Sequence, residues 1–141
     1  MALFKALTYL DDRYADSKLP GHERRNYAVI GPGLGVKDQK TPEPGLVIRE
    51  GFNLSYVESK PGNGASWHVH DQNETFIPHT GRWRIYFDKN DQHFAEIGPL
   101  DVCAVPPGVI RRFENVTPGE PDRLHLIMVI LAGSEPKAEF V

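Results

Sequence analysis

One segment, from Gly62 to Gly81, constrains the fold and the chemistry more than any other part of the sequence. It carries His68 and His70 two residues apart, and Glu74 follows four residues later. Side chains of an extended strand alternate between two faces, so His68 and His70 share a face at roughly 6.6–7 Å. Glu74 lies at an even separation and can supply an oxygen from the same side. The segment therefore predicts a β-strand that aims ligand-type side chains at one point.

This combination of side chains is suited to a transition metal. Imidazole nitrogen and carboxylate oxygen coordinate such ions at about 2.0–2.2 Å. Two histidines with one carboxylate form the open ligand set of non-haem iron sites and of several related metals. We therefore expect a divalent metal on His68, His70 and Glu74. Iron is the favoured ion, and the same set also tolerates manganese, nickel, zinc and copper.

From about residue 46 onward, the chain has the pattern of short strands separated by turns. Its 13 glycines and 12 prolines are spread along the 141 residues, as expected where turns are frequent. One stretch alternates clearly, with Trp83, Ile85 and Phe87 on one face and Arg84 and Tyr86 on the other. About eight such strands follow one another at intervals typical of a β-sandwich or barrel. The fold class is therefore all-β, and periodicity alone does not separate the two architectures.

The first part of the chain is less regular, because charged and turn-forming residues interrupt its weak apolar clusters. We assign residues 1–45 to an N-terminal arm or to extra strands. We assign residues 46–141 to the β-barrel, within a single domain overall, which suits the length of the chain.

Bulk composition excludes several partners. The net charge is -3, and no long basic run favours nucleic acid. The single cysteine, Cys103, excludes an internal disulfide and fits a reducing compartment. The N-terminus lacks the pattern of a signal peptide, and no apolar run approaches the roughly 18 residues that span a bilayer. We expect a cytoplasmic protein without a membrane partner.

The spacing of the opening segment resembles the first motif of the cupin superfamily. That motif runs glycine, five residues, His-x-His, three or four residues, glutamate, six residues, glycine. Every spacing is met by Gly62, His68, His70, Glu74 and Gly81.

The second cupin motif runs glycine, five residues, Pro-x-Gly, two residues, histidine, three residues, asparagine. Pro106, Gly108 and Asn115 stand in register with it, whereas Leu100 takes the place of the glycine and Arg111 that of the metal-binding histidine. The resemblance covers roughly residues 46–132. It implies a double-stranded β-helix, or jelly-roll barrel, often dimeric, with a metal in its mouth. It does not imply one reaction, because the fold hosts dioxygenases, isomerases, epimerases, storage proteins and regulators.

Arg111 leaves three arrangements open, because guanidinium has no lone pair to give to a metal. In the first, which we favour, the metal stays on the three ligands and Arg111 anchors an anionic substrate through its carboxylate or phosphate. In the second, another histidine completes the site, His125 before His79 or His93. In the third, no metal binds and the histidines act as acid–base groups or hydrogen-bond donors, as in some metal-free epimerases of the cupin class.

These considerations predict an enzyme, dioxygenase-like or isomerase-like, that acts on a small carboxylate- or phosphate-bearing molecule. Arg111 is the expected anion anchor, and Tyr86 is a further catalytic candidate because its hydroxyl could reach the site. Arg112 should face away from Arg111. The alternatives are a binding module that captures a small anionic or sugar-like ligand without turnover, and a metal-free epimerase-like enzyme. The stretch from Leu126 to Leu131 is apolar on both faces and, with the resemblance, predicts a homodimer.

Overall fold

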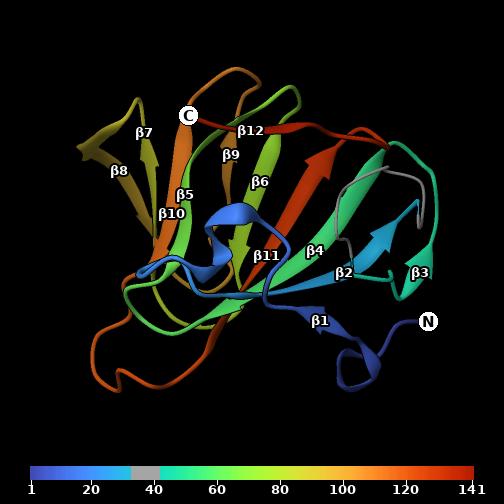
Figure 1. Ribbon diagram of the computed structural model, residues 1–141, viewed down its shortest axis with the longest axis horizontal. Coiled ribbons are helices and arrows are strands. Elements are labelled where there is room, and N and C mark those ends of the chain that lie inside the picture. The colour runs from blue at the N-terminus through green and yellow to red at the C-terminus, as the bar shows by residue number, and fades with distance from the viewer. Residues whose placement is uncertain (33–41) are drawn as a thin grey trace.

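Alternation of inward and outward side chains builds two β-sheets that face each other across the core (Figure 1). The computed structural model describes residues 1–32 and 42–141. One sheet has seven strands in the order β1-β2-β4-β11-β6-β9, with β3 beside β2. The other has five strands in the order β12-β5-β10-β7-β8. All the pairings are antiparallel except that of β2 with β3. The all-β prediction is confirmed.

The strands of the seven-stranded sheet are β1 (Tyr9–Leu10), β2 (Arg25–Gly31), β3 (Leu46–Val47), β4 (Phe52–Ser59), β6 (Glu74–Pro78), β9 (Cys103–Val105) and β11 (His125–Ala132). Those of the five-stranded sheet are β5 (Gly64–His70), β7 (Trp83–Phe87), β8 (Asn90–Ile97), β10 (Arg111–Asn115) and β12 (Ala138–Phe140). Two 3₁₀ turns, η1 (Phe4–Ala6) and η2 (Ala15–Lys18), lie before β2.

The core fills the space between the sheets with large apolar side chains from both. Complete burial of such a side chain stabilises the fold by about 1.5–3 kcal/mol. The side chains with no exposed surface include those of Phe76, Trp83, Ile85, Val105 and Ile127. Polar side chains gather at one end of the barrel, where β5 ends and β6 begins, and this end holds the candidate site.

Backbone conformation explains why glycine stands at two positions of the first cupin-like motif. Gly62 and Gly81 have φ of 85° and 78°, a left-handed conformation that glycine adopts without strain. A Cβ at Gly81 would also collide with the His125 ring. Leu100, which stands where the second motif has glycine, likewise has a positive φ of 70°. The backbone there keeps the glycine conformation although the residue is leucine.

The N-terminal part joins the barrel rather than lying apart from it. Strand β2 pairs along β4, with Tyr27 opposite Tyr56, and β1 pairs with β2. The ring of Phe4 packs against both of these tyrosines, at centroid distances of 5.0 and 5.9 Å. The division at residue 45 stays a prediction.

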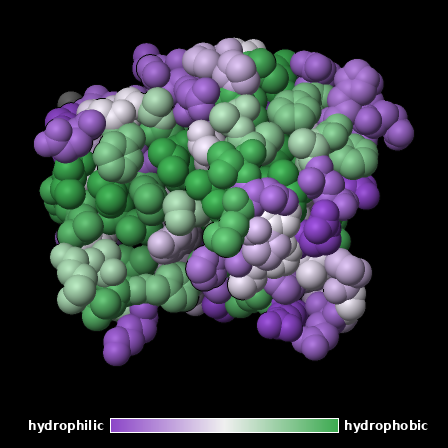
Figure 2. All heavy atoms as spheres, turned by 180° about the vertical axis from the view of Figure 1, so that it is seen from behind, coloured by the Kyte–Doolittle hydropathy of each residue, from purple (hydrophilic) through white to green (hydrophobic). Residues whose placement is uncertain are grey.

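The outer face of the seven-stranded sheet is apolar. Leu126, Met128 and Ile130 point outward from β11 and are half-buried, whereas Ile127 and Val129 between them are buried in the core. Figure 2 shows hydrophobic residues gathered on the side of the molecule where β2, β4 and β11 lie in Figure 1. The predicted homodimer remains a prediction. No helix in the described ranges has the length and apolar character that a bilayer span requires.

Candidate metal centre

Three potential ligands converge at the open end of the barrel. His68 and His70 come from the last three residues of β5, and Glu74 is the first residue of β6. Their exposed fractions are only 5%, 6% and 3%. Nε2 of His70 lies 3.1 Å from Oε2 of Glu74, and Nε2 of His68 lies 3.6 Å from Oε1. One ligand atom from each residue lies within 4.8 Å of the others, close enough to share a metal ion.

Backbone hydrogen bonds fix the protonation of the nitrogen on the far side of each imidazole. Nδ1 of His68 lies 2.7 Å from the Ser66 carbonyl oxygen, and Nδ1 of His70 lies 2.8 Å from that of Lys137. A carbonyl oxygen only accepts, so each Nδ1 must donate a proton. In the neutral tautomer, both Nε2 lone pairs therefore point at Glu74, the arrangement found in metal-ligating histidines.

Glu74 faces these nitrogens as a carboxylate. Burial favours its neutral form, yet the hydrogen bonds and charges of His68 and His70 outweigh burial and lower the pKa of Glu74 from 4.5 to about 2. Its Oε1 is buried without a hydrogen-bond partner. Lone pairs and an anionic oxygen at these distances require a cation between them, either a metal ion or protons on the imidazoles. The donor set thus fits a divalent transition metal.

Arg111 lies behind Glu74 and is fully buried. Its Nε is 3.5 Å from Oε1 of Glu74, and its Nη2 donates to the Pro106 carbonyl oxygen at 3.0 Å. Burial lowers the pKa of Arg111, and the charge of Glu74 partly opposes this effect. The guanidinium does not border the cavity beside the site. The anion that Arg111 faces in this structure is Glu74, and its predicted role as a substrate anchor remains a prediction.

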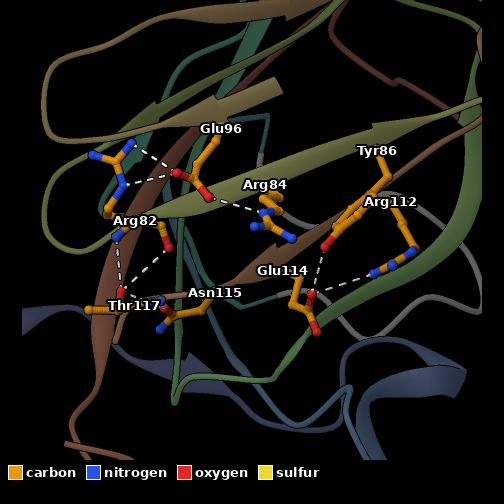
Figure 3. Close-up of polar contacts among 8 residues, drawn as sticks. All are labelled: Arg82, Arg84, Tyr86, Glu96, Arg112, Glu114, Asn115 and Thr117. Carbon is orange, nitrogen blue, oxygen red and sulfur yellow. Dashed lines mark hydrogen bonds and ion pairs between the residues drawn. The ribbon is translucent and has the colours of Figure 1, made fainter. Parts of the chain in front are cut away.

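Tyr86 also lies elsewhere than expected. Its hydroxyl donates to Oε2 of Glu114 at 3.0 Å, and the guanidinium carbon of Arg112 lies 3.7 Å from its ring centroid (Figure 3). Strand alternation explains this position, because Ile85 points into the core and Tyr86 must then point outward. The hydroxyl thus bonds outside the cavity that adjoins the three ligands, and the catalytic role of Tyr86 remains a prediction. Arg112 does face away from Arg111, as expected.

No further histidine completes the ligand set within the described residues. His125 is buried at the opposite end of the barrel, six residues before Leu131, which pairs with Glu74. That separation is roughly 20 Å along an extended strand. Burial and the Arg123 charge both lower the pKa of His125. His79 and His93 are exposed. The arrangement with a fourth histidine ligand is thus wrong.

A cavity of about 40 Å³ adjoins the three ligands. Phe113, Val129 and Leu131 give it apolar walls. Sequence reasoning missed the part of its lining that comes from the two ends of the chain, which includes Arg13, Tyr14, Arg24, Asn26 and Phe140. The only sequence signal for these residues was the weak apolar cluster of Tyr27 to Ile30, which marks β2.

Comparisons with known proteins give the fold its name. No family model matches the chain, and no curated protein matches it. Among solved structures, a cupin-like protein from Thermotoga maritima aligns at 17% identity and a TM-score of 0.59, over 85% of this chain and 77% of its own. The DMSP lyase DddQ from Ruegeria pomeroyi aligns at 18% identity and a TM-score of 0.59, over 82% and 50%.

A sugar phosphate isomerase of the cupin superfamily from Silicibacter pomeroyi aligns at 24% identity and a TM-score of 0.52, over 65% of this chain and 57% of its own. The chain thus spans only about half the length of this isomerase and of the lyase. These likenesses show that the chain has the cupin fold, a double-stranded β-helix, and they confirm the predicted jelly-roll barrel.

Proposed function

We propose that this cupin-fold chain is a metal-dependent enzyme. A divalent transition metal would bind His68, His70 and Glu74, and a small carboxylate- or phosphate-bearing substrate would occupy the adjoining cavity. The observation that carries the proposal is the convergence of two Nε2 atoms on a buried carboxylate whose Oε1 lacks a hydrogen-bond partner. A bound metal would supply Lewis-acid or oxygen-activating chemistry of a dioxygenase-like or isomerase-like kind, with iron favoured.

The surrounding residues prepare the site for this role. The carbonyl oxygens of Ser66 and Lys137 hold the imidazoles in one tautomer and one orientation. The buried charge of Arg111 beside Glu74 favours the ionised carboxylate that a metal needs. Three protein ligands leave other coordination positions free for water or substrate. The lyase and the isomerase that share the fold support an enzyme of small molecules, without naming the substrate.

Elemental analysis tests this proposal on protein produced in metal-replete medium. We expect about one transition-metal ion per chain in the wild type and a loss of metal in His68→Ala, because a pair of ligands rarely retains an ion that three hold. His93→Ala is the matched control, since His93 is exposed and lies outside the cluster. Wild-type protein without any transition metal would overturn the proposal.

A second candidate is a metal-free protein, either an epimerase-like enzyme or a binding module for a small anionic or sugar-like ligand. The 3.1 Å contact of His70 with Glu74 favours it, because a protonated imidazole would satisfy both groups without a metal. A chelator separates the two candidates. Removal of a metal lowers the melting temperature by mass action, whereas a metal-free protein melts unchanged and keeps its ligand affinity.

A further inference from the structure

The cavity wall contributed by the N-terminal part holds a polar group without a partner. Asn26 points inward from β2, opposite Val57 in the register, and is only 3% exposed. Its side chain lines the cavity, yet Nδ2 is buried without a hydrogen-bond partner. Buried amide groups are nearly always paired, so an unpaired donor that borders a cavity indicates a ligand that carries an acceptor.

The nearby charge of Arg24 is already neutralised. Its Nη2 lies 2.8 Å from Oδ1 of Asp16, and both side chains are almost fully buried. Asp16 also accepts a hydrogen bond of 2.9 Å from the Ser66 backbone N–H. Arg24 donates in addition to the His22 carbonyl oxygen at 2.8 Å. This pair therefore fastens η2 to β5 and offers no free charge to a ligand.

Arg13 is the cation that remains available to the cavity. It is half-buried and lines the cavity, and its guanidinium carbon lies 5.0 Å from the centroid of the Tyr14 ring. Within residues 1–32 and 42–141, it has no ion-pair partner. The cavity wall therefore carries the guanidinium of Arg13 without a counter-charge and the amide donor of Asn26 without an acceptor among the described residues.

Apolar side chains make up much of the remaining cavity wall. The rings of Tyr14 and Phe140 lie 5.9 Å apart at the wall, although they come from opposite ends of the chain. Phe140 also lies 6.0 Å from the ring of His68, which connects this wall to the candidate metal ligands. Val129 and Leu131 border the same space. A short hydrocarbon body would therefore lie among apolar side chains, with its polar end near Asn26.

We propose that Asn26 and Arg13 form the substrate-anchoring subsite and that the substrate is a small monocarboxylate with a short apolar body. The inference rests on the proposed function, because the other end of such a molecule would lie against His68, His70 and Glu74. A planar, singly charged carboxylate matches one guanidinium and one amide donor. A phosphate carries up to two negative charges and more acceptor oxygens than these two groups can satisfy.

Titration calorimetry with propionate tests the subsite, with its neutral isostere propionamide and with inorganic phosphate as comparison ligands. Wild type should bind propionate, and Asn26→Leu and Arg13→Gln should each weaken that binding by about tenfold or more. Arg49→Gln is the matched control, because Arg49 is exposed and pairs with Glu135. Arg13→Gln keeps the test decisive if Asn26→Leu fails to fold, since Arg13 is only half-buried.

Three results would overturn the inference: no propionate binding by wild type, propionamide or phosphate binding as tightly as propionate, or wild-type affinity in a folded variant. Metal content measured on the same samples shows whether the subsite or the metal-dependent enzyme is contradicted. A metal-free protein that loses propionate binding in both variants supports the subsite and contradicts the enzyme. A metal-loaded protein whose two variants keep the wild-type affinity for propionate supports the enzyme and contradicts the subsite.

Discussion

Arg111 holds its Nε 3.5 Å from Oε1 of Glu74, at the position where the cupin resemblance implies a metal-binding histidine. A cation thus faces the one carboxylate that a metal would use. Because Nε and Nη1 of Arg111 are buried without hydrogen-bond partners, Glu74 is the only anion that compensates its charge among the described residues. The positive charge would repel a divalent ion and also favours the ionised form of Glu74, so we expect Arg111 to weaken the binding of a metal at this site.

Replacing Arg111 by histidine should therefore strengthen metal binding. The substitution removes a repelling charge and offers a third imidazole as a fourth ligand, and we expect the metal affinity to rise by about tenfold or more. Competition with a chromophoric chelator measures the change. Arg112→His is the control, because Arg112 lies on the outer face against Tyr86. Equal or weaker binding in Arg111→His would show that the guanidinium does not oppose the metal.

Replacing Leu100 by glycine should stabilise the fold. Leu100 has a φ of 70° and is 80% exposed, so the substitution relieves backbone strain and removes little packing. The greater flexibility of glycine in the unfolded chain offsets part of the gain, which leaves about 0.5–1 kcal/mol. Urea unfolding measures it. Leu100→Ala is the control and should show no such gain, since alanine keeps the strain. A loss of stability in the glycine variant would contradict this account of Leu100.

Acid should destabilise the protein through Glu74. Its pKa falls from 4.5 to about 2 on folding, so the unfolded state binds more protons between these values. The stabilisation is complete above pH 4.5 and is lost as the pH falls toward 2, at most about 3 kcal/mol. Urea unfolding at a series of pH values measures this loss.

Glu74→Gln is the comparison for the acid series. It cannot titrate and should lose less stability over the same pH window. At neutral pH it should be less stable by about 3–5 kcal/mol, because Arg111 would be left buried without its counter-charge. Identical acid profiles for the two proteins would refute the assignment of the titration to Glu74.

The apolar outer face of the seven-stranded sheet should pack against a second copy of the chain. Met128 and its outward neighbours form a face that can pack on itself about a two-fold axis, and a large exposed apolar patch marks an interaction site. Sedimentation should give a dimer for wild type and a monomer for Met128→Lys. Val69→Lys, on the outer face of β5, should stay dimeric. A monomeric wild type contradicts the homodimer.

The sequence predicted the parts of the site that depend on local spacing. His68 and His70 could be assigned to one face because strand alternation acts within a few residues, whereas Glu74 begins β6 of the other sheet and was assigned from the spacing of the motif. The same rule puts Tyr86 on the face opposite the core residue Ile85, although we named Tyr86 a catalytic candidate. Alternation correctly predicted that Arg111 points inward. It did not predict that the side chain is fully buried against Glu74, because Glu74 belongs to the other sheet.

Asn26 and Arg13 could not be predicted in the same way. Asn26 reaches the cavity only because β2 pairs with β4, a long-range contact in a region without strong periodicity, and Arg13 lies just before η2, outside any strand. No motif marks them, and the missing partner of Asn26 becomes visible only when the surrounding side chains are placed.

Anomalous diffraction from crystals of metal-replete protein tests the central claim most directly. The account predicts one anomalous peak about 2.0–2.2 Å from Nε2 of His68, Nε2 of His70 and an oxygen of Glu74. Absence of a peak, with the imidazoles hydrogen-bonded directly to Glu74, would contradict the metal centre.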